Sequence, residues 1–92
     1  MKVNINDLLQ EIRDLAPIYS KKFFISETGA EKFIRLAIKY LAKTEFNLKI
    51  DENLIIGEKK KLEKFRNEIL NWDEDEFDEE DFKIIGYCQN IR

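Results

Sequence analysis

The chain has 92 residues and a net charge of −3; 43% of its residues are hydrophobic and 12% are aromatic. This length indicates one folded domain, residues 1–92, and this composition excludes a disordered chain. No apolar run approaches the roughly 18 residues of a membrane span, and the N-terminus lacks the apolar core of a signal peptide. The single cysteine, Cys88, excludes an internal disulfide and fits a reducing compartment, so we expect a cytoplasmic protein that binds no membrane.

The acidic residues are concentrated near the C-terminus. Residues 1–72 carry 14 Lys and Arg against 11 Asp and Glu, whereas residues 73–92 carry two against eight. All eight of those carboxylates fall within residues 73–81, which we call the acidic segment. A localised field of this kind favours some binding partners over others.

The first predicted helix covers residues 5–16. Asn4 suits its N-cap, and apolar residues then recur at the helical period. Pro17 is predicted to end this helix, because proline disfavours the α conformation in the residue before it. The stretch IYSKKFFIS that follows, residues 18–26, fits either a short strand or an aromatic-rich connector.

The second predicted helix begins at TGAE and ends at about residue 43 or 44. Thr28 as N-cap and Glu31 three residues later form a capping-box pattern at its start. Its apolar residues cover more than one narrow stripe of the helix surface. This helix is therefore expected to be the central element of the domain.

Residues 46–57 are compatible with two structures. In one, Phe46, Leu48 and Ile50 alternate as a strand and pair with LII across a turn at DEN. In the other, Asp51 caps a helix that continues through Gly57. A third helix is predicted over residues 58–72, where the helical period is kept by Leu62, Phe65, Ile69 and Trp72.

Three aromatic residues, Trp72, Phe77 and Phe82, border and interrupt the acidic segment. Their spacing of five places them on no common face of a helix or strand, so we predict a break inside the segment, held in place by Phe77. Asp78 suits the N-cap of a last helix, whose first turn would be acidic as the helix dipole favours. The apolar face of that helix would consist of Ile84, Ile85, Cys88 and Ile91, unless FKIIGYC, residues 82–88, is a strand.

Several kinds of chemistry are absent from the sequence. There is no histidine, the few serines and threonines lie outside nucleophile motifs, and three isolated glycines make no phosphate-binding loop. An EF-hand loop starting at Asp73 would place Phe77 at a ligand position, so that calcium pattern fails. Cys88 lies on an apolar pattern and is expected to be a buried structural thiol. The sequence therefore predicts a non-enzymatic protein without a cofactor or a metal site.

A basic stripe is predicted on the second helix, at steps of three, four and four residues: Lys32, Arg35, Lys39 and Lys43. One interpretation is contact with phosphate groups. The other is a solvated helix face, or an intramolecular partner for the acidic segment. Because the whole chain is acidic, direct binding to nucleic acid is not expected.

The acidic segment has a charge density close to that of nucleic acid. As a helix it would carry one charge per about 1.7 Å, and as a strand one per about 3.7 Å. Duplex DNA carries about one per 1.7 Å of axis and a single strand about one per 3.4 Å. Either conformation would imitate a phosphate backbone and fit a basic nucleic-acid cleft. The alternative is a solvated turn followed by a favourably charged helix start.

Three pieces of the chain, NINDLLQEI, FISETGAEKFI and WDEDEFDEEDF, resemble in the same order the small acidic phage anti-CRISPR proteins that inhibit type II effector nucleases. The resemblance implies a non-enzymatic DNA mimic that blocks the site reading the DNA flank, at work in the cytoplasm of a host cell. It covers about a third of the chain. The family has antiparallel strands between the first two pieces, where this chain has only residues 17–24.

We therefore expect a mainly α-helical domain of about four helices, with a short β-hairpin near residues 46–56 or, alternatively, an α+β fold. The expected function is inhibition of a nuclease or another nucleic-acid-binding protein through its basic surface, as an anti-CRISPR, immunity or antitoxin protein. A nucleic-acid-associated helical domain that binds phosphate through the basic stripe is the alternative. The expected partner-binding residues, with Trp72 and Phe77 as apolar anchors, are Trp72, Asp73, Glu74, Asp75, Glu76, Phe77, Asp78, Glu79, Glu80 and Asp81.

Overall fold

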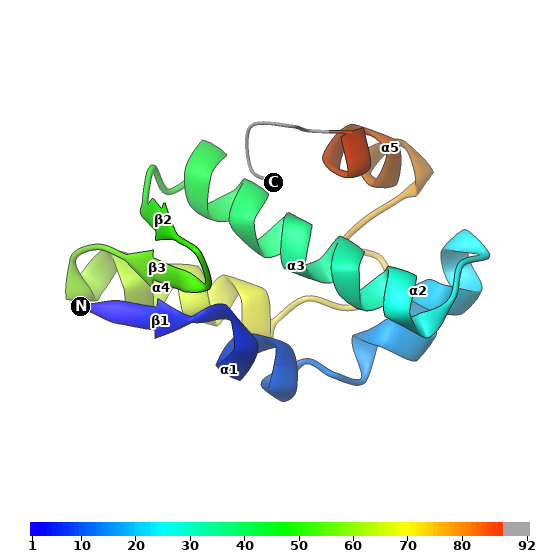
Figure 1. Ribbon diagram of the computed structural model, residues 1–92, viewed down its shortest axis with the longest axis horizontal. Coiled ribbons are helices and arrows are strands. Elements are labelled where there is room, and N and C mark those ends of the chain that lie inside the picture. Colours follow the sequence, from blue (N-terminus) through cyan, green and yellow to red (C-terminus); the bar gives the residue numbers. More distant parts are fainter. Residues whose placement is uncertain (88–92) are drawn as a thin grey trace.

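Helix α3 (Glu27–Thr44) crosses the middle of the molecule in the computed structural model, which describes residues 1–87 (Figure 1). Helices α1 (Ile5–Glu11), α2 (Leu15–Phe23), α4 (Lys59–Leu70) and α5 (Glu79–Tyr87) surround it. Strands β1 (Lys2–Asn4), β2 (Lys49–Asp51) and β3 (Leu54–Ile56) form an antiparallel sheet in the order β1-β3-β2. The predicted fold class, mainly α with a short β-hairpin, is confirmed, with five helices rather than about four over the described residues.

The hairpin predicted near residues 46–56 is present. Ile50 of β2 lies opposite Ile55 of β3, and the turn between the strands places Glu52 at a φ of 53°. The alternative helix capped by Asp51 is wrong, because these residues pair in a sheet instead. Strand β1 was not predicted, since three residues are too few to show a period; Val3 lies opposite Ile55 on its other edge.

The first predicted helix is in fact two helices. Helix α1 ends at Glu11, and α2 begins at Leu15 and runs through most of IYSKKFFIS. Pro17 does not end a helix; it lies in the first turn of α2, where a backbone N–H has no intrahelical acceptor and its loss costs no hydrogen bond. The strand and the connector predicted for residues 18–26 are therefore both wrong.

The helix ends also differ from the predicted ones. Ser26 caps α3, because its Oγ accepts a hydrogen bond from the Gly29 N–H at 3.0 Å, so the capping box of Thr28 and Glu31 is wrong. Helix α4 ends at Leu70, two residues before Trp72. The last element is a helix through Tyr87, which contradicts the strand alternative, and within it Ile85 is buried but Ile84 is 51% exposed. Cys88 and Ile91 lie outside the described residues.

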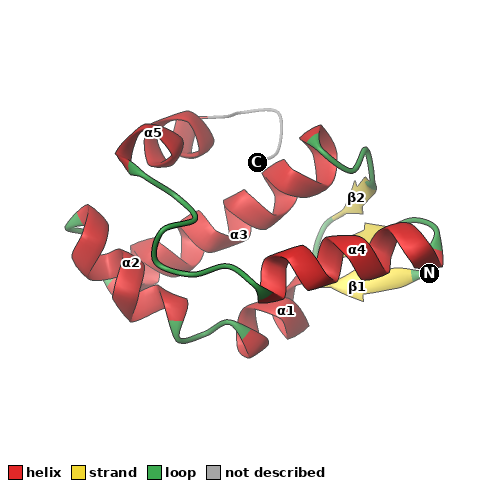
Figure 2. Cartoon of the chain, turned by 180° about the vertical axis from the view of Figure 1, so that it is seen from behind, coloured by secondary structure: helices red, strands yellow, loops and turns green. Residues whose placement is uncertain are grey.

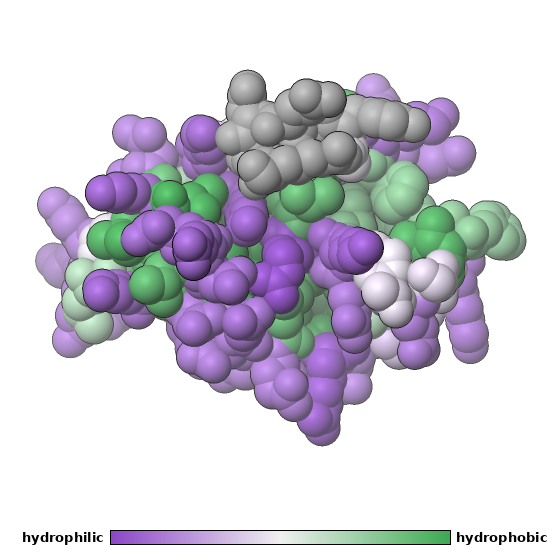
Figure 3. Space-filling model, in the orientation of Figure 1, coloured by the Kyte–Doolittle hydropathy of each residue, from purple (hydrophilic) through white to green (hydrophobic). Residues whose placement is uncertain are grey.

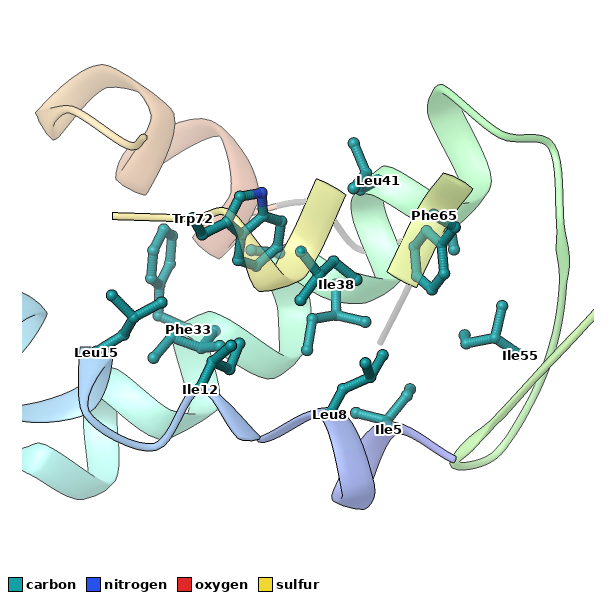
Figure 4. Packing of buried hydrophobic residues seen from close by; sticks show 14 of the residues in the cluster. Ile5, Leu8, Ile12, Leu15, Phe33, Ile38, Leu41, Ile55, Phe65 and Trp72 are labelled. Atoms are coloured by element: carbon teal, nitrogen blue, oxygen red, sulfur yellow. The ribbon is translucent and has the colours of Figure 1, made fainter. Parts of the chain in front are cut away.

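The hydrophobic core lies between α3 and the other elements (Figure 4). Ile5 and Leu8 of α1, Ile38 of α3, Ile55 of β3 and Phe65 of α4 are all at most 1% exposed. Each such burial contributes about 1.5–3 kcal/mol, so this packing fixes α1, α4 and the sheet against α3. Among residues 1–87, no helix combines the length and the apolar character needed to cross a bilayer.

One aromatic side chain stands outside this core. Phe24, the C-cap of α2, is 95% exposed and has the left-handed backbone conformation, with φ 56° and ψ 46°. In Figure 3, hydrophobic residues reach the surface at the end of the molecule where α2 meets α3. A phenylalanine lowers stability there for two reasons: its Cβ disfavours the left-handed conformation, and its ring remains exposed to solvent.

The substitution Phe24→Gly is expected to raise the free energy of unfolding by about 0.5–1 kcal/mol, because glycine is the usual residue at a left-handed helix end. Urea unfolding would measure it. Phe24→Ala is the control, since it removes the ring but keeps the Cβ, and it is expected to change stability little. A destabilised glycine variant would show that the ring contributes to the fold.

Candidate functional site

The acidic segment leaves α4, crosses the molecule beside α2 and α3 and enters α5 (Figure 2). Its first half is a turn, in which Asp73 accepts hydrogen bonds from the N–H of Asp75 at 2.9 Å and of Glu76 at 3.3 Å. Its second half is a reciprocal cap. Asp78 Oδ1 accepts from the Asp81 N–H at 2.8 Å, and Asp81 Oδ2 accepts from the Asp78 N–H at 3.1 Å. The predicted break and the N-cap at Asp78 are both confirmed.

This shape excludes a regular charge spacing along the whole segment. The segment is neither one helix nor one strand, since the turn of residues 73–76 precedes a helix that starts at Glu79. The helical and extended spacings that match nucleic acid therefore do not run through it. What remains is a compact cluster of carboxylates rather than a line of them.

Aromatic packing holds the segment in place from beneath. The Phe77 ring lies 4.9 Å from Trp72, 5.3 Å from Phe33 and 6.0 Å from Tyr19, measured between ring centroids, with all three pairs edge to face. Such pairs contribute about 0.5–1.5 kcal/mol each beyond their burial. Phe82 is likewise half buried against the hydrophobic core. Phe77 thus holds the break, as predicted, but it does so from inside the fold.

Two hydrogen bonds from α2 fix the segment's backbone. The Tyr19 hydroxyl donates to the carbonyl oxygen of Asp73, and Lys22 Nζ donates to the carbonyl oxygen of Glu74 at 2.6 Å. Burial raises the pKa of the Tyr19 phenol, and the neighbouring carboxylates raise it further, so the hydroxyl remains a donor. This role of α2 was not predicted, because Tyr19 and Lys22 fall on one side of the chain only when residues 15–23 form a helix.

The carboxylates themselves face solvent. Within the acidic segment only Asp81 and Phe77 are half buried, and the other residues are exposed. The one ion pair among the described residues joins Arg66 to Glu11 at 2.6 Å, between α4 and α1. No carboxylate of the acidic segment is therefore neutralised by a salt bridge within residues 1–87.

Among residues 1–87, no salt bridge joins the basic stripe to the acidic segment. Arg35 donates to Asn53 Oδ1 at 2.7 Å and to Asn6 Oδ1 at 2.8 Å, so it ties α3 to α1 and to the hairpin turn. Lys32 and Arg35 line a groove of about 510 Å³ between α1 and α3, together with Arg13. The groove thus contains two of the four residues of the basic stripe, and Lys39 and Lys43 are not among its lining residues.

A cleft of about 210 Å³, which we call the α3–α5 cleft, opens beside the acidic segment. Its lining includes Trp72 and brings together four carboxylates: Glu45, Glu68, Glu76 and Asp81. The pKa of Glu76 is raised, mainly by burial and further by the charges of neighbouring carboxylates: Glu68, Asp73, Glu45 and Asp81. By contrast, the backbone N–H of Asp81 lowers the pKa of Asp78. Glu45 lies at the end of α3 and Glu68 in α4, both outside the acidic segment, so no pattern within the segment pointed to them.

The predicted apolar anchors are not surface residues. Trp72 is 7% exposed and Phe77 is half buried, so both stabilise the fold of the segment. The exposed aromatic next to the segment is Phe24. It borders a second cleft, of about 620 Å³, whose lining also includes Phe23, Phe82 and Glu79. No cluster of residues in the range 1–87 has the arrangement that a metal ion requires.

We expect Glu76→Gln to make the protein more stable at pH 7. A pKa raised in the folded state means that ionised Glu76 opposes folding at pH 7, and glutamine removes that charge. The advantage should shrink as the pH falls through the pKa of Glu76, because the wild-type side chain is then protonated. Urea unfolding between pH 7 and pH 4 would measure this. Glu80→Gln, an exposed neighbour outside the α3–α5 cleft, is the control; an equal gain there would contradict a local cause.

No family model, curated protein sequence or solved structure matches this chain.

Proposed function

We propose that this chain is a non-enzymatic inhibitor that binds a basic, nucleic-acid-handling site on a partner protein through the acidic segment. The observation that supports this most is a dense set of exposed carboxylates, without ion pairs in residues 1–87, on a backbone held by Tyr19, Lys22 and Phe77. Charges that are not neutralised within the fold keep their field for a partner. A backbone that is already ordered loses less entropy on binding.

The density of charge favours a partner site that normally holds phosphate groups. Eight carboxylates in nine residues repel one another, and a matching group of Lys or Arg side chains would relieve that repulsion. Because the carboxylates form a compact turn and a helix start, the fitting surface is a basic patch or pocket rather than a long groove. Phe24, beside Glu79 at the second cleft, offers the exposed aromatic contact that interfaces favour at their centres.

The biological class of the inhibitor is part of the same proposal. The resemblance to anti-CRISPR proteins supports a nuclease as the partner and the cytoplasm as the place of action. An immunity or antitoxin protein that blocks a basic nuclease site would use the same physics. In each case the protein acts by occupation of the site, without a cofactor and without chemistry of its own.

Two charge variants with equal net charge test the proposal. Both replace eight Asp or Glu by Asn or Gln, which changes the net charge from −3 to +5. The test variant neutralises the eight carboxylates of the acidic segment. The control variant neutralises eight exposed carboxylates elsewhere: Asp7, Asp14, Glu27, Glu31, Asp51, Glu52, Glu58 and Glu63.

Partners captured from host lysate by the tagged wild type would be identified by mass spectrometry, and their association rates measured by stopped flow against ionic strength. Wild type and control are expected to associate fast and to slow steeply with salt. The test variant should associate about 10–1,000-fold more slowly, with little salt dependence, because it lacks the steering field. Equal association by the test variant would contradict the proposal and leave the segment a solvated turn.

The α1–α3 groove favours a second candidate, a domain that binds nucleic-acid phosphate through Arg13, Lys32 and Arg35. We expect the wild type to give no complex with duplex DNA or RNA in a gel-shift titration at near-physiological salt, since the acidic segment opposes binding. A micromolar complex, weakened by Lys32→Gln but not by Lys60→Gln on α4, would favour this candidate over the inhibitor.

A further inference from the structure

We propose that the α3–α5 cleft is a binding site for an arginine residue of the partner, with the guanidinium among the cleft's carboxylates and a carbonyl oxygen of the same peptide at the Trp72 indole. This inference deepens the proposed function and depends on it for the identity of the partner. Whether the cleft binds an arginine residue does not depend on the proposed function and can be tested separately.

The first support is the origin of the cleft's carboxylates. Glu45 is the C-cap of α3, Glu68 lies in α4, Glu76 in the turn of the acidic segment and Asp81 in the first turn of α5. Four separate elements thus direct acidic residues to one cleft, and no lysine or arginine of residues 1–87 lines it. Burial and, after it, the neighbouring like charges raise the pKa of Glu76, and a bound cation would relieve the repulsion between those charges.

The second support is an unpartnered hydrogen-bond donor. Only 7% of the Trp72 surface is exposed. Among the described residues, its Nε1 is the one buried side-chain nitrogen or oxygen atom without a hydrogen-bond partner. Figure 4 shows the indole nitrogen on the edge of the ring nearest Leu41, and both residues line the α3–α5 cleft. A buried N–H without an acceptor is unfavourable, so it selects a ligand that brings one.

These two features together select an arginine residue. A guanidinium has several N–H donors in one plane for carboxylates on different sides, and its flat face stacks on aromatic rings such as those of Tyr40, Trp72 and Phe77. The carbonyl groups of a peptide supply the acceptor that the indole N–H lacks. A bare metal ion would leave that donor unpaired, and a lysine ammonium would satisfy fewer carboxylates at once.

The chain carries its own probe for this cleft, because Trp72 is its only tryptophan. The full chain, labelled with ¹⁵N, would be titrated with N-acetyl-arginine N-methylamide while the indole N–H resonance is followed. We expect a saturable shift of that resonance. The citrulline analogue has nearly the same shape but no charge, and it should give no saturable shift; the lysine analogue should bind more weakly than arginine.

Matched double variants connect the response to the cleft. Glu68→Gln with Glu76→Gln should weaken binding of the arginine probe about tenfold or more, because two charged acceptors are lost. Glu79→Gln with Glu80→Gln removes the same charge from residues that do not line the cleft, and it should change binding by less than about threefold. The amide spectrum of each variant shows whether it is folded.

Three outcomes would overturn the site: no saturable shift with the arginine probe, an equal response to the citrulline analogue, or probe binding by Arg92→Gln but not by wild type. The last would mean that the cleft accepts an arginine of this chain instead. None of these outcomes contradicts the proposed function, which fails if the eight-charge test variant still associates with the partner as the wild type does. Arginine binding in the cleft together with that failure would leave the site standing without the inhibitor.

Discussion

The insertion of Phe77 among Trp72, Phe33 and Tyr19 is the interaction on which the acidic segment depends. Carboxylates close together in sequence repel one another and favour an open, solvated chain. One aromatic residue in their midst, packed edge to face on three others, reverses this preference. It divides the segment into a turn and a helix start, and it brings both halves onto α2 and α3.

The magnitudes show why this arrangement is stable. A like-charge pair at helical spacing costs about 0.2–0.5 kcal/mol at an exposed site. The three ring contacts of Phe77 contribute about 0.5–1.5 kcal/mol each beyond burial, and Asp78 and Asp81 satisfy each other's backbone donors. The anchors therefore outweigh several repulsive pairs, and the fold accepts a charge density that an unanchored loop would relieve by opening.

The sequence predicted the parts of the fold that local patterns control. The apolar periods of α3 and α4, the alternation in the hairpin and the break at Phe77 all follow from spacing along the chain. Pro17 misled the prediction, because proline is tolerated in a first helical turn and the same residue can end a helix or start one. The α3–α5 cleft could not be predicted from the sequence, because Glu45, Glu68 and Glu76 come together only when α4 and the acidic segment pack on α3.

Three local features conflict with stability, and all three lie at or beside the acidic segment. Phe24 is exposed in a left-handed conformation, Glu76 has a raised pKa, and the Trp72 indole lacks an acceptor. In most folds such conflicts are few, and those that persist cluster where binding requires them. In the proposed complex, the open carboxylates would act at long range and set the rate of encounter, whereas the buried indole donor and the crowded Glu76 carboxylate would act only on contact and slow dissociation. Under the proposed function, the segment and the cleft would serve successive stages of one association: the field would bring a basic surface near, and the cleft would distinguish an arginine that fits from a residue that is merely positive.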